Sequence, residues 1–150
     1  MTTVDDTVIL GTAPLQLLGH PQQMHAAGVR GVVNMCAEYN GPTAAYRTLG
    51  ITQLHLPTVD HFEPSVESMQ QAVAFIKEHQ ARGERVYVHC KAGHGRAAAI
   101  TLCWMLDESR GVTAKEANAL LHSKRKIRQT LWKQQNVQAF KAQLDARTKR

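Results

Sequence analysis

Short apolar segments alternate with longer amphipathic ones along the 150 residues of the chain. Four short segments, 7–11, 31–36, 51–56 and 85–88, have the lengths and residue types of β-strands. Segment 31–36 is mostly β-branched and apolar, which is typical of a central strand with both faces buried. Segment 51–56 alternates apolar and polar residues, which is the period of a strand.

The longer segments have the spacing of helices. Between residues 65 and 81, Val66, Met69, Val73 and Ile76 fall on one helical face, and Gly83 follows as a stop signal. A capping box, Thr113 to Glu116, opens another helix. The further predicted helices are 21–27, 42–49, 97–106, 113–121 and 133–145, of which the last buries Val137, Phe140 and Leu144.

Strands that alternate with helices predict an α/β fold with a mainly parallel central sheet flanked by helices. The length of the chain is that of one domain, so we assign residues 1–150 to a single domain. Ligands of such sheets bind at the carboxyl ends of the strands. The loops that follow the predicted strands are therefore the first places to look for chemistry.

The loop after segment 85–88 has the strongest chemical pattern. It is His-Cys-Lys-Ala-Gly-His-Gly-Arg over residues 89–96, between a predicted strand and a predicted helix. Backbone N–H groups converge in such a loop and the helix N-terminus adds partial positive charge, so that together they bind an anion. Gly93 and Gly95 allow positive φ and a close approach of the backbone to a ligand. We predict a phosphate-binding loop formed by Lys91, Ala92, Gly93, His94 and Gly95.

Cys90 opens this loop and Arg96 closes it, with five residues between them. N–H donors and a guanidinium stabilise a thiolate, which is the nucleophilic form of cysteine, and the planar fork of Arg96 matches phosphoryl oxygens. Attack by Cys90 on a phosphate monoester would form a cysteinyl-phosphate that water hydrolyses. His89 would orient the loop through hydrogen bonds. The alternative is a buried cysteine that ends a strand, with Arg96 on a helix surface.

The motif His-Cys-x2-Gly-x2-Arg resembles the signature of the cysteine-dependent protein-tyrosine and dual-specificity phosphatase superfamily. Segments 31–34, 38–39, 58–60 and 86–93 are most similar to the mitochondrial and plant-type phosphatidylglycerophosphate phosphatases. Segment 34–38 also resembles the tensin-type phosphoinositide phosphatases. The resemblance implies a dual-specificity-phosphatase-like fold and hydrolysis of a lipid phosphate without metal or cofactor. A phosphotyrosine or dual-specificity protein phosphatase is the alternative.

The resemblance also implies a proton donor. Asp60 lies thirty residues before Cys90, directly after a predicted strand, and matches the family's general acid. Alternatively it ends the strand and caps a turn, in which case His61 or Glu63 would substitute. Ala97 departs from the family, which has Ser or Thr after the loop arginine. Hydrolysis of the phosphoenzyme would then be slow unless another group substitutes.

Five further side chains have two interpretations each. Glu38 and Tyr39 would border the substrate pocket, or Tyr39 covers the edge of the core. Lys91 and His94 favour a polyanionic or lipid substrate, or they are a solvated lysine and a structural histidine. The resemblance of segment 34–38 to the tensin-type phosphatases implies that Cys36 forms a reversible disulfide with Cys90, which would protect the nucleophile from oxidation. The alternative is that Cys36 is a small core residue.

A net charge of +6 favours anionic partners. The basic segments 124–128 and 147–150 would contact an anionic membrane, or they are solvated helix ends. We expect no nucleic-acid partner, because no aromatic stacking platform accompanies the charge. The sequence indicates no particular oligomeric state.

Cys36, Cys90 and Cys103 are odd in number, widely spread and without a metal-ligand pattern. They predict a reducing intracellular compartment, either the cytoplasm or a membrane surface, or the mitochondrion if a targeting segment is missing. The N-terminus has no features of a signal or transit peptide, and no apolar run approaches the ~20 residues of a membrane span. Two other classes of protein remain as alternatives to a phosphatase. One is a phosphate-binding module without turnover. The other is a sulfurtransferase, which the closing Arg96 and the upstream Asp60 disfavour.

Overall fold

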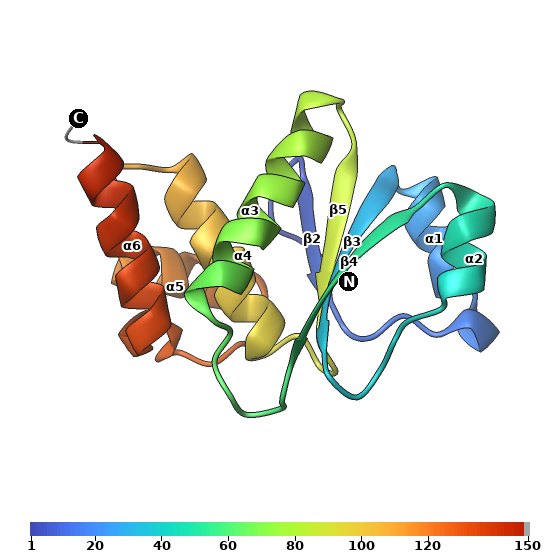
Figure 1. Ribbon diagram of the computed structural model, residues 1–150, viewed down its shortest axis with the longest axis horizontal. Coiled ribbons are helices and arrows are strands. Elements are labelled where there is room, and N and C mark those ends of the chain that lie inside the picture. The colour runs from blue at the N-terminus through green and yellow to red at the C-terminus, as the bar shows by residue number, and fades with distance from the viewer. Residues whose placement is uncertain (149–150) are drawn as a thin grey trace.

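A sheet that is parallel except at one edge separates two layers of helices (Figure 1). The computed structural model describes residues 1–148. Within them the strand order is β1-β2-β5-β3-β4, and β1 pairs antiparallel with β2 while the other pairs are parallel. The strands are β1 (Thr2–Thr3), β2 (Val8–Gly11), β3 (Val29–Cys36), β4 (Thr52–Thr58) and β5 (Arg85–His89). The predicted α/β class with a mainly parallel sheet is confirmed.

The helices cover the two faces of the sheet unequally (Figure 1). The smaller layer contains α1 (His20–Ala26) and α2 (Thr43–Leu49). The larger layer contains α3 (Val66–Ala81), α4 (Arg96–Glu108), α5 (Ala114–Lys124) and α6 (Gln135–Thr148). Two short 3-10 helices, η1 (Gln16–Leu18) and η2 (Leu131–Lys133), were not predicted. The predicted capping box is present, because Thr113 accepts from the Glu116 N–H and the Glu116 carboxylate accepts from Thr113.

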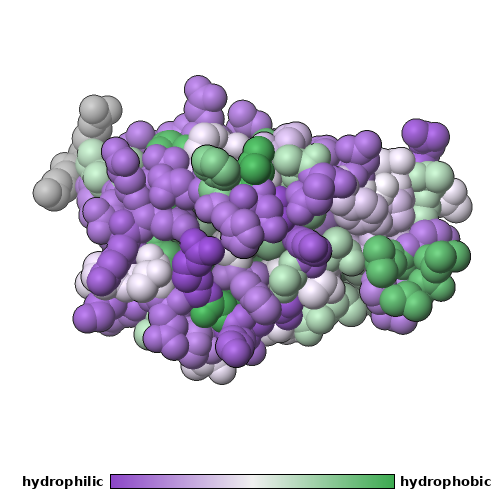
Figure 2. Space-filling view, turned by 90° about the horizontal axis from the view of Figure 1, so that it is seen from below, coloured by the Kyte–Doolittle hydropathy of each residue, from purple (hydrophilic) through white to green (hydrophobic). Residues whose placement is uncertain are grey.

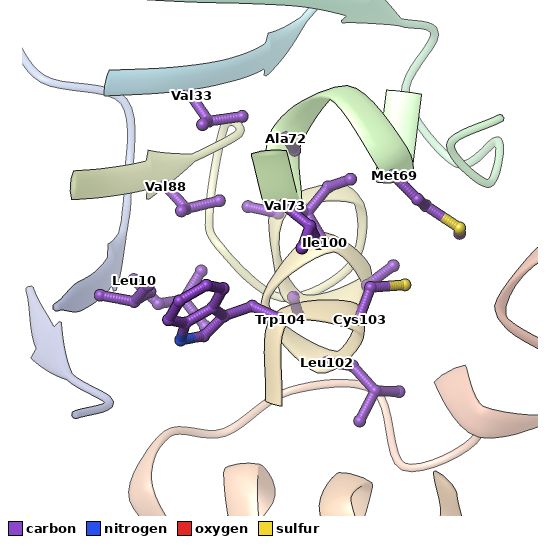
Figure 3. Close-up of a cluster of buried hydrophobic side chains, with 14 of the residues drawn as sticks. Leu10, Val33, Met69, Ala72, Val73, Val88, Ile100, Leu102, Cys103 and Trp104 are labelled. Carbon is purple, nitrogen blue, oxygen red and sulfur yellow. The ribbon is translucent and has the colours of Figure 1, made fainter. Parts of the chain in front are cut away.

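Helix α4 forms the centre of the larger core. Residues 96–104 are all buried, so this part of the helix is enclosed by other elements and has no solvent-exposed face. The Trp104 indole N–H donates to the Asp5 carboxylate at 2.8 Å and so ties α4 to the N-terminal strands. Figure 3 shows side chains of the sheet facing those of α3 and α4, among them Leu10, Val33, Val88, Met69, Val73, Ile100 and Trp104.

This packing fixes the loop between β5 and α4 at the carboxyl edge of the sheet, the lower edge in Figure 1. Strand β5 is central, with Gly11 of β2 paired to His89 on one side and Asn34 of β3 paired to His89 on the other. The residues that follow β3, β4 and β5 therefore meet at one edge. In the described part of the chain, no helix combines the length and the apolar character needed to cross a membrane.

Candidate active site

The loop after β5 has the backbone of an anion-binding cradle. Gly93 has φ +76°, as predicted, and a Cβ there would lie 2.7 Å from the Gly11 carbonyl oxygen, so a side chain would clash with backbone. Gly95 has φ −127°, so the prediction of positive φ at that position is wrong. A Cβ at Gly95 would lie 3.9 Å from Arg128 Nη2, which is an ordinary van der Waals distance.

The loop carbonyls point away from the cradle and are all bonded on the outer side. Lys91 O accepts from the Ala13 N–H at 3.2 Å, and His94 O accepts from the Arg128 N–H at 3.0 Å. Arg125 donates to Ala92 O at 2.7 Å and to Gly93 O at 3.3 Å. Because C=O and the next N–H point in opposite directions in a trans peptide, the N–H groups of residues 92–95 face the inner side.

Arg125 is thus a structural residue of the site that the sequence did not reveal. Its third contact is with the Thr2 hydroxyl at 3.1 Å, so it joins the loop to the edge strand β1. The sequence indicated only a basic run suited to a membrane. A contact between residues as far apart in the sequence as Thr2 and Arg125 cannot be predicted from local pattern.

Cys90 lies inside the cradle, only 4% exposed, and its Sγ accepts from the Gly93 N–H at 3.2 Å. His89 is fully buried, with Nδ1 at 3.2 Å from Cys90 O. Burial lowers the pKa of His89 to about 4, so the ring is neutral at neutral pH and Nδ1–H donates to that carbonyl. This is the contact expected of a residue that orients the loop.

Arg96 is 3% exposed, which excludes the alternative of a surface arginine. Its Nη1 donates to Glu38 Oε1 and to Thr58 O, both at 2.7 Å, and its Nη2 donates to Glu38 Oε2 at 2.8 Å. Nε–H is buried and has no partner among the described residues. The protein therefore holds the guanidinium by its far edge and leaves a donor for a ligand.

Glu38 and Tyr39 differ from the expectation that they border the substrate. Neither is among the described residues that line the pocket. Glu38 instead binds Arg96, and the guanidinium lowers the pKa of the Glu38 carboxyl to about 2, so the carboxylate stays charged. The Tyr39 hydroxyl donates to Pro14 O at 2.5 Å, and its ring packs against the larger core.

Asp60 lies in the loop between β4 and α3, half exposed, with Oδ1 at 3.4 Å from Arg96 Nη2. Glu63, one of the substitutes for it, accepts from the Asn136 N–H at 3.1 Å and so caps α6. His61, the other, has a largely exposed side chain and Nε2 at 3.7 Å from Asp60 Oδ2. Of the three candidates for the proton donor, Asp60 is the one whose carboxylate lies at ion-pair distance from Arg96.

These groups open into one pocket of about 390 Å³. Three elements supply the predicted reacting groups, because Cys90 follows β5, Arg96 begins α4 and Asp60 follows β4. The remaining lining comes from the phosphate loop, the Asp60 loop and the segment after α5. It consists of His61, Phe62, Pro64, Lys91, Ala92, His94, Gly95, Lys126, Ile127, Arg128 and Gln134.

Cys36, Cys90 and Cys103 are buried free thiols. Cys36 follows the register pair Asn34–His89 and so ends the strand beside the nucleophile's own. Burial and the Glu38 charge raise the pKa of the Cys36 thiol to about 11, so it is protonated at neutral pH. The disulfide with Cys90 and the reducing compartment both stay predictions.

Ala97, which stands where the family has Ser or Thr, is fully buried. The nearby Thr101 hydroxyl donates to Ala97 O at 2.9 Å. Lys149 and Arg150 of the basic C-terminus lie outside the described residues. Within residues 1–148, no cluster of three or more His, Cys, Asp or Glu side chains is arranged to hold a metal ion.

Comparison with known proteins defines the class. Residues 8–144 match the family "Dual specificity phosphatase, catalytic domain", and the chain belongs to this family. The human phosphatidylglycerophosphatase and protein-tyrosine phosphatase 1 is 37% identical over an alignment of 109 residues, and the match covers 69% of this chain and 54% of that protein. Phosphatidylglycerophosphate phosphatase PTPMT1 of Arabidopsis thaliana is 33% identical over an alignment of 123 residues, and the match covers 80% of this chain and 36% of that protein.

A crystal structure of PTPMT1 in complex with PI(5)P superposes with a TM-score of 0.83 at 28% identity, and the match covers 96% of both chains. The resemblance to phosphatidylglycerophosphate phosphatases seen in the sequence is thereby confirmed. The chain spans about half the length of the human relative and about a third of the plant one.

Proposed function

We propose that residues 1–150 form one catalytic domain that hydrolyses phosphate monoesters through a cysteinyl-phosphate. One observation carries this proposal: Cys90, Arg96 and Asp60 come from three elements to one pocket, below inward-facing loop amides. A nucleophile, an oxyanion cradle and an acid within one cavity are the parts that phosphoryl transfer through cysteine needs.

In the first step the phosphoryl oxygens bind the N–H groups of residues 92–95 and Nε of Arg96. The Cys90 thiolate attacks phosphorus, an S–P bond forms, and the P–O ester bond breaks as Asp60 gives its proton to the leaving oxygen. In the second step Asp60, now a carboxylate, takes a proton from water that attacks phosphorus. The S–P bond then breaks, and inorganic phosphate and the thiolate are released.

For the substrate we propose a lipid phosphate, with phosphatidylglycerophosphate first and phosphoinositides next. The names of the relatives and the PI(5)P complex of PTPMT1 support this choice, as do the cationic side chains that line the pocket. Dual-specificity family membership supports the alternative, a protein phosphatase.

Phosphate release from phosphatidylglycerophosphate, phosphoinositides and phosphotyrosine peptides tests the proposal. We expect kcat/KM to be highest for phosphatidylglycerophosphate. A higher value for the peptides would make the chain a protein phosphatase. A single burst of leaving group equal to the enzyme concentration, without steady release, would support the rival of a binding module with little turnover, which the buried Ala97 favours.

We also propose peripheral contact with an anionic membrane through the leucines around η1. Leu15, Leu17 and Leu18 are exposed, Leu17 to 99%. Figure 2 looks onto the face where the strands end and shows hydrophobic surface gathered at the end that carries η1. Exposed apolar side chains at one end of a face that also carries cationic side chains suit an interface of acyl chains and anionic headgroups.

Vesicle sedimentation tests this contact. Since burying one leucine is worth about 1.5–3 kcal/mol, Leu17→Ser with Leu18→Ser is expected to weaken binding to phosphatidylglycerol vesicles by about tenfold or more. Binding should also fall as salt rises. Leu120, exposed on α5, gives the matched control Leu120→Ser. Equal losses in the control and the double variant would rule out η1 as the anchor.

A further inference from the structure

We propose that Lys126 and Arg128 form a second anion site beside the phosphate loop, which binds a second phosphate group of the same substrate. The inference rests on the proposed phosphatase function and extends it to the substrate class. That class is a phosphate monoester whose alcohol also carries a phosphodiester.

The segment that carries both residues is rigidly attached to the loop. Its centre, Ile127, is 5% exposed, and the Arg128 N–H donates to His94 O at 3.0 Å. Buried Asn118 of α5 donates to Arg128 O at 3.2 Å and accepts from the Trp132 N–H at 2.9 Å, which fixes the segment from the other side. The side chains of residues 126 and 128 therefore start from positions that the fold determines.

Lys126 and Arg128 both line the pocket of Cys90 and Arg96. A Cβ placed on Gly95 would lie 3.9 Å from Arg128 Nη2, so this guanidinium lies against the start of α4, where the phosphate loop ends.

Arg125 and Arg128 differ in whether their guanidinium groups are available to a ligand. Arg125 donates to Ala92 O, Gly93 O and the Thr2 hydroxyl, which leaves it little capacity for a ligand. No carboxylate within the described range of the chain lies at ion-pair distance from Lys126 or Arg128. Unpaired cations at the wall of a pocket are available for an anion.

The charge of the pocket exceeds what one phosphoryl group needs. Among the described lining residues, Lys91, Arg96, Lys126 and Arg128 are cationic and Asp60 is the one carboxylate. The charge of Arg96 is already matched by Glu38 behind it. A phosphate monoester brings about −1.5 to −2, and the cradle amides and Arg96 bind it. Lys91, Lys126 and Arg128 then remain, and Lys126 and Arg128 lie together on one segment, where they can bind a second anion.

The chemistry of this second anion is that of a phosphodiester in the same headgroup, as in phosphatidylglycerophosphate and in phosphoinositides. A doubly phosphorylated peptide presents two monoesters and belongs to another class of ligand. Matched soluble compounds separate the contributions. Glycerophosphoglycerol phosphate has both phosphate groups and no acyl chains, whereas glycerol 3-phosphate has the same type of ester and no second phosphate.

The test measures kcat/KM of the wild-type, Arg128→Ala, Lys126→Ala and Lys124→Ala proteins on both compounds. A charge-assisted contact is worth about 1.5–3 kcal/mol, so Arg128→Ala should lower kcat/KM for glycerophosphoglycerol phosphate about tenfold or more, through KM. Lys126→Ala should act in the same direction, and Arg128→Lys should recover part of the loss. Glycerol 3-phosphate should change less than about twofold with each variant, and Lys124→Ala, outside the pocket, should change neither substrate.

Binding of both compounds to Cys90→Ser protein, measured by calorimetry with and without Arg128→Ala, tests the site independently of turnover. Equal losses on the two compounds would overturn the proposal, because Arg128 would then act only by holding the loop through His94. No loss on either compound would overturn it as well. If the binding difference is present but the wild-type protein releases no phosphate, the second site stands and the proposed phosphatase function fails.

Discussion

Replacing Cys90 with serine is expected to lower phosphate release by about four orders of magnitude or more, since the loss of a covalent nucleophile is among the most damaging single changes in an enzyme. The cradle of amides stabilises an anion and supplies no base that would activate a serine hydroxyl. His89 is neutral, but its Nδ1 bonds to Cys90 O rather than to the side chain. Binding of phosphate should persist, because the loop amides and Arg96 do not depend on the sulfur.

Steady-state phosphate release and calorimetric binding of inorganic phosphate measure the two effects separately. Cys103→Ala is the matched control, because Cys103 is a buried thiol of α4 that does not line the pocket. Circular dichroism shows whether each variant is folded. More than about one per cent of wild-type release in Cys90→Ser protein would mean that another group attacks phosphorus.

Local pattern was sufficient for the elements that build the cradle. Apolar β5, the Gly-containing loop and the apolar start of α4 follow one another in the sequence, and each is determined by its own residues. Local pattern indicated that glycine lets this loop approach a ligand, which is correct for the φ of Gly93 and wrong for that of Gly95. The Gly11 carbonyl that leaves Gly93 no room for a side chain comes from another strand and is not visible in local sequence. Edge strand β1 could not be predicted, because its two residues show no periodicity and pair only because β2 is present.

The supports of the site depend on contacts that sequence does not encode locally. Glu38 was expected at the substrate, yet it binds Arg96, 58 positions away. Glu63 was a candidate acid, yet its carboxylate caps α6, 73 positions away. Arg125 was expected either at an anionic membrane or on a solvated helix end, yet it binds the carbonyl of Ala92 in the phosphate loop. In each case the sequence showed the residue type and its position at a loop. It did not show the distant residue to which the side chain binds.

These supports explain how Cys90, Arg96 and Asp60 can work in one pocket. Arg96 is held between Glu38 and the carbonyl of Thr58, so its orientation does not depend on substrate. Asp60, at 3.4 Å from Nη2, is therefore free to exchange a proton without the loss of the arginine that binds the phosphoryl group. Separate groups for positioning and for proton transfer predict that the two functions can be removed independently.

Asp60→Asn is accordingly expected to lower kcat for an alkyl phosphate by about 10²–10⁴, the usual contribution of a general acid, with little change in KM. The amide oxygen can still accept from Arg96 and from the His61 N–H, so the pocket keeps its shape, but the amide cannot give up a proton. An alkoxide leaves poorly without protonation, whereas p-nitrophenolate leaves well without it. The loss on p-nitrophenyl phosphate should therefore be at least about tenfold smaller than on glycerol 3-phosphate.

Glu63→Gln is the matched control for this dependence on the leaving group. Its amide oxygen can still accept from the Asn136 N–H at the start of α6, so only a charge in the same loop is removed. We expect its rates on the two esters to change by the same small factor. If Asp60→Asn slows both esters equally, Asp60 acts by positioning Arg96 and not as the acid. If Glu63→Gln shows the larger loss on the alkyl ester, Glu63 leaves its helix cap during turnover and is the proton donor.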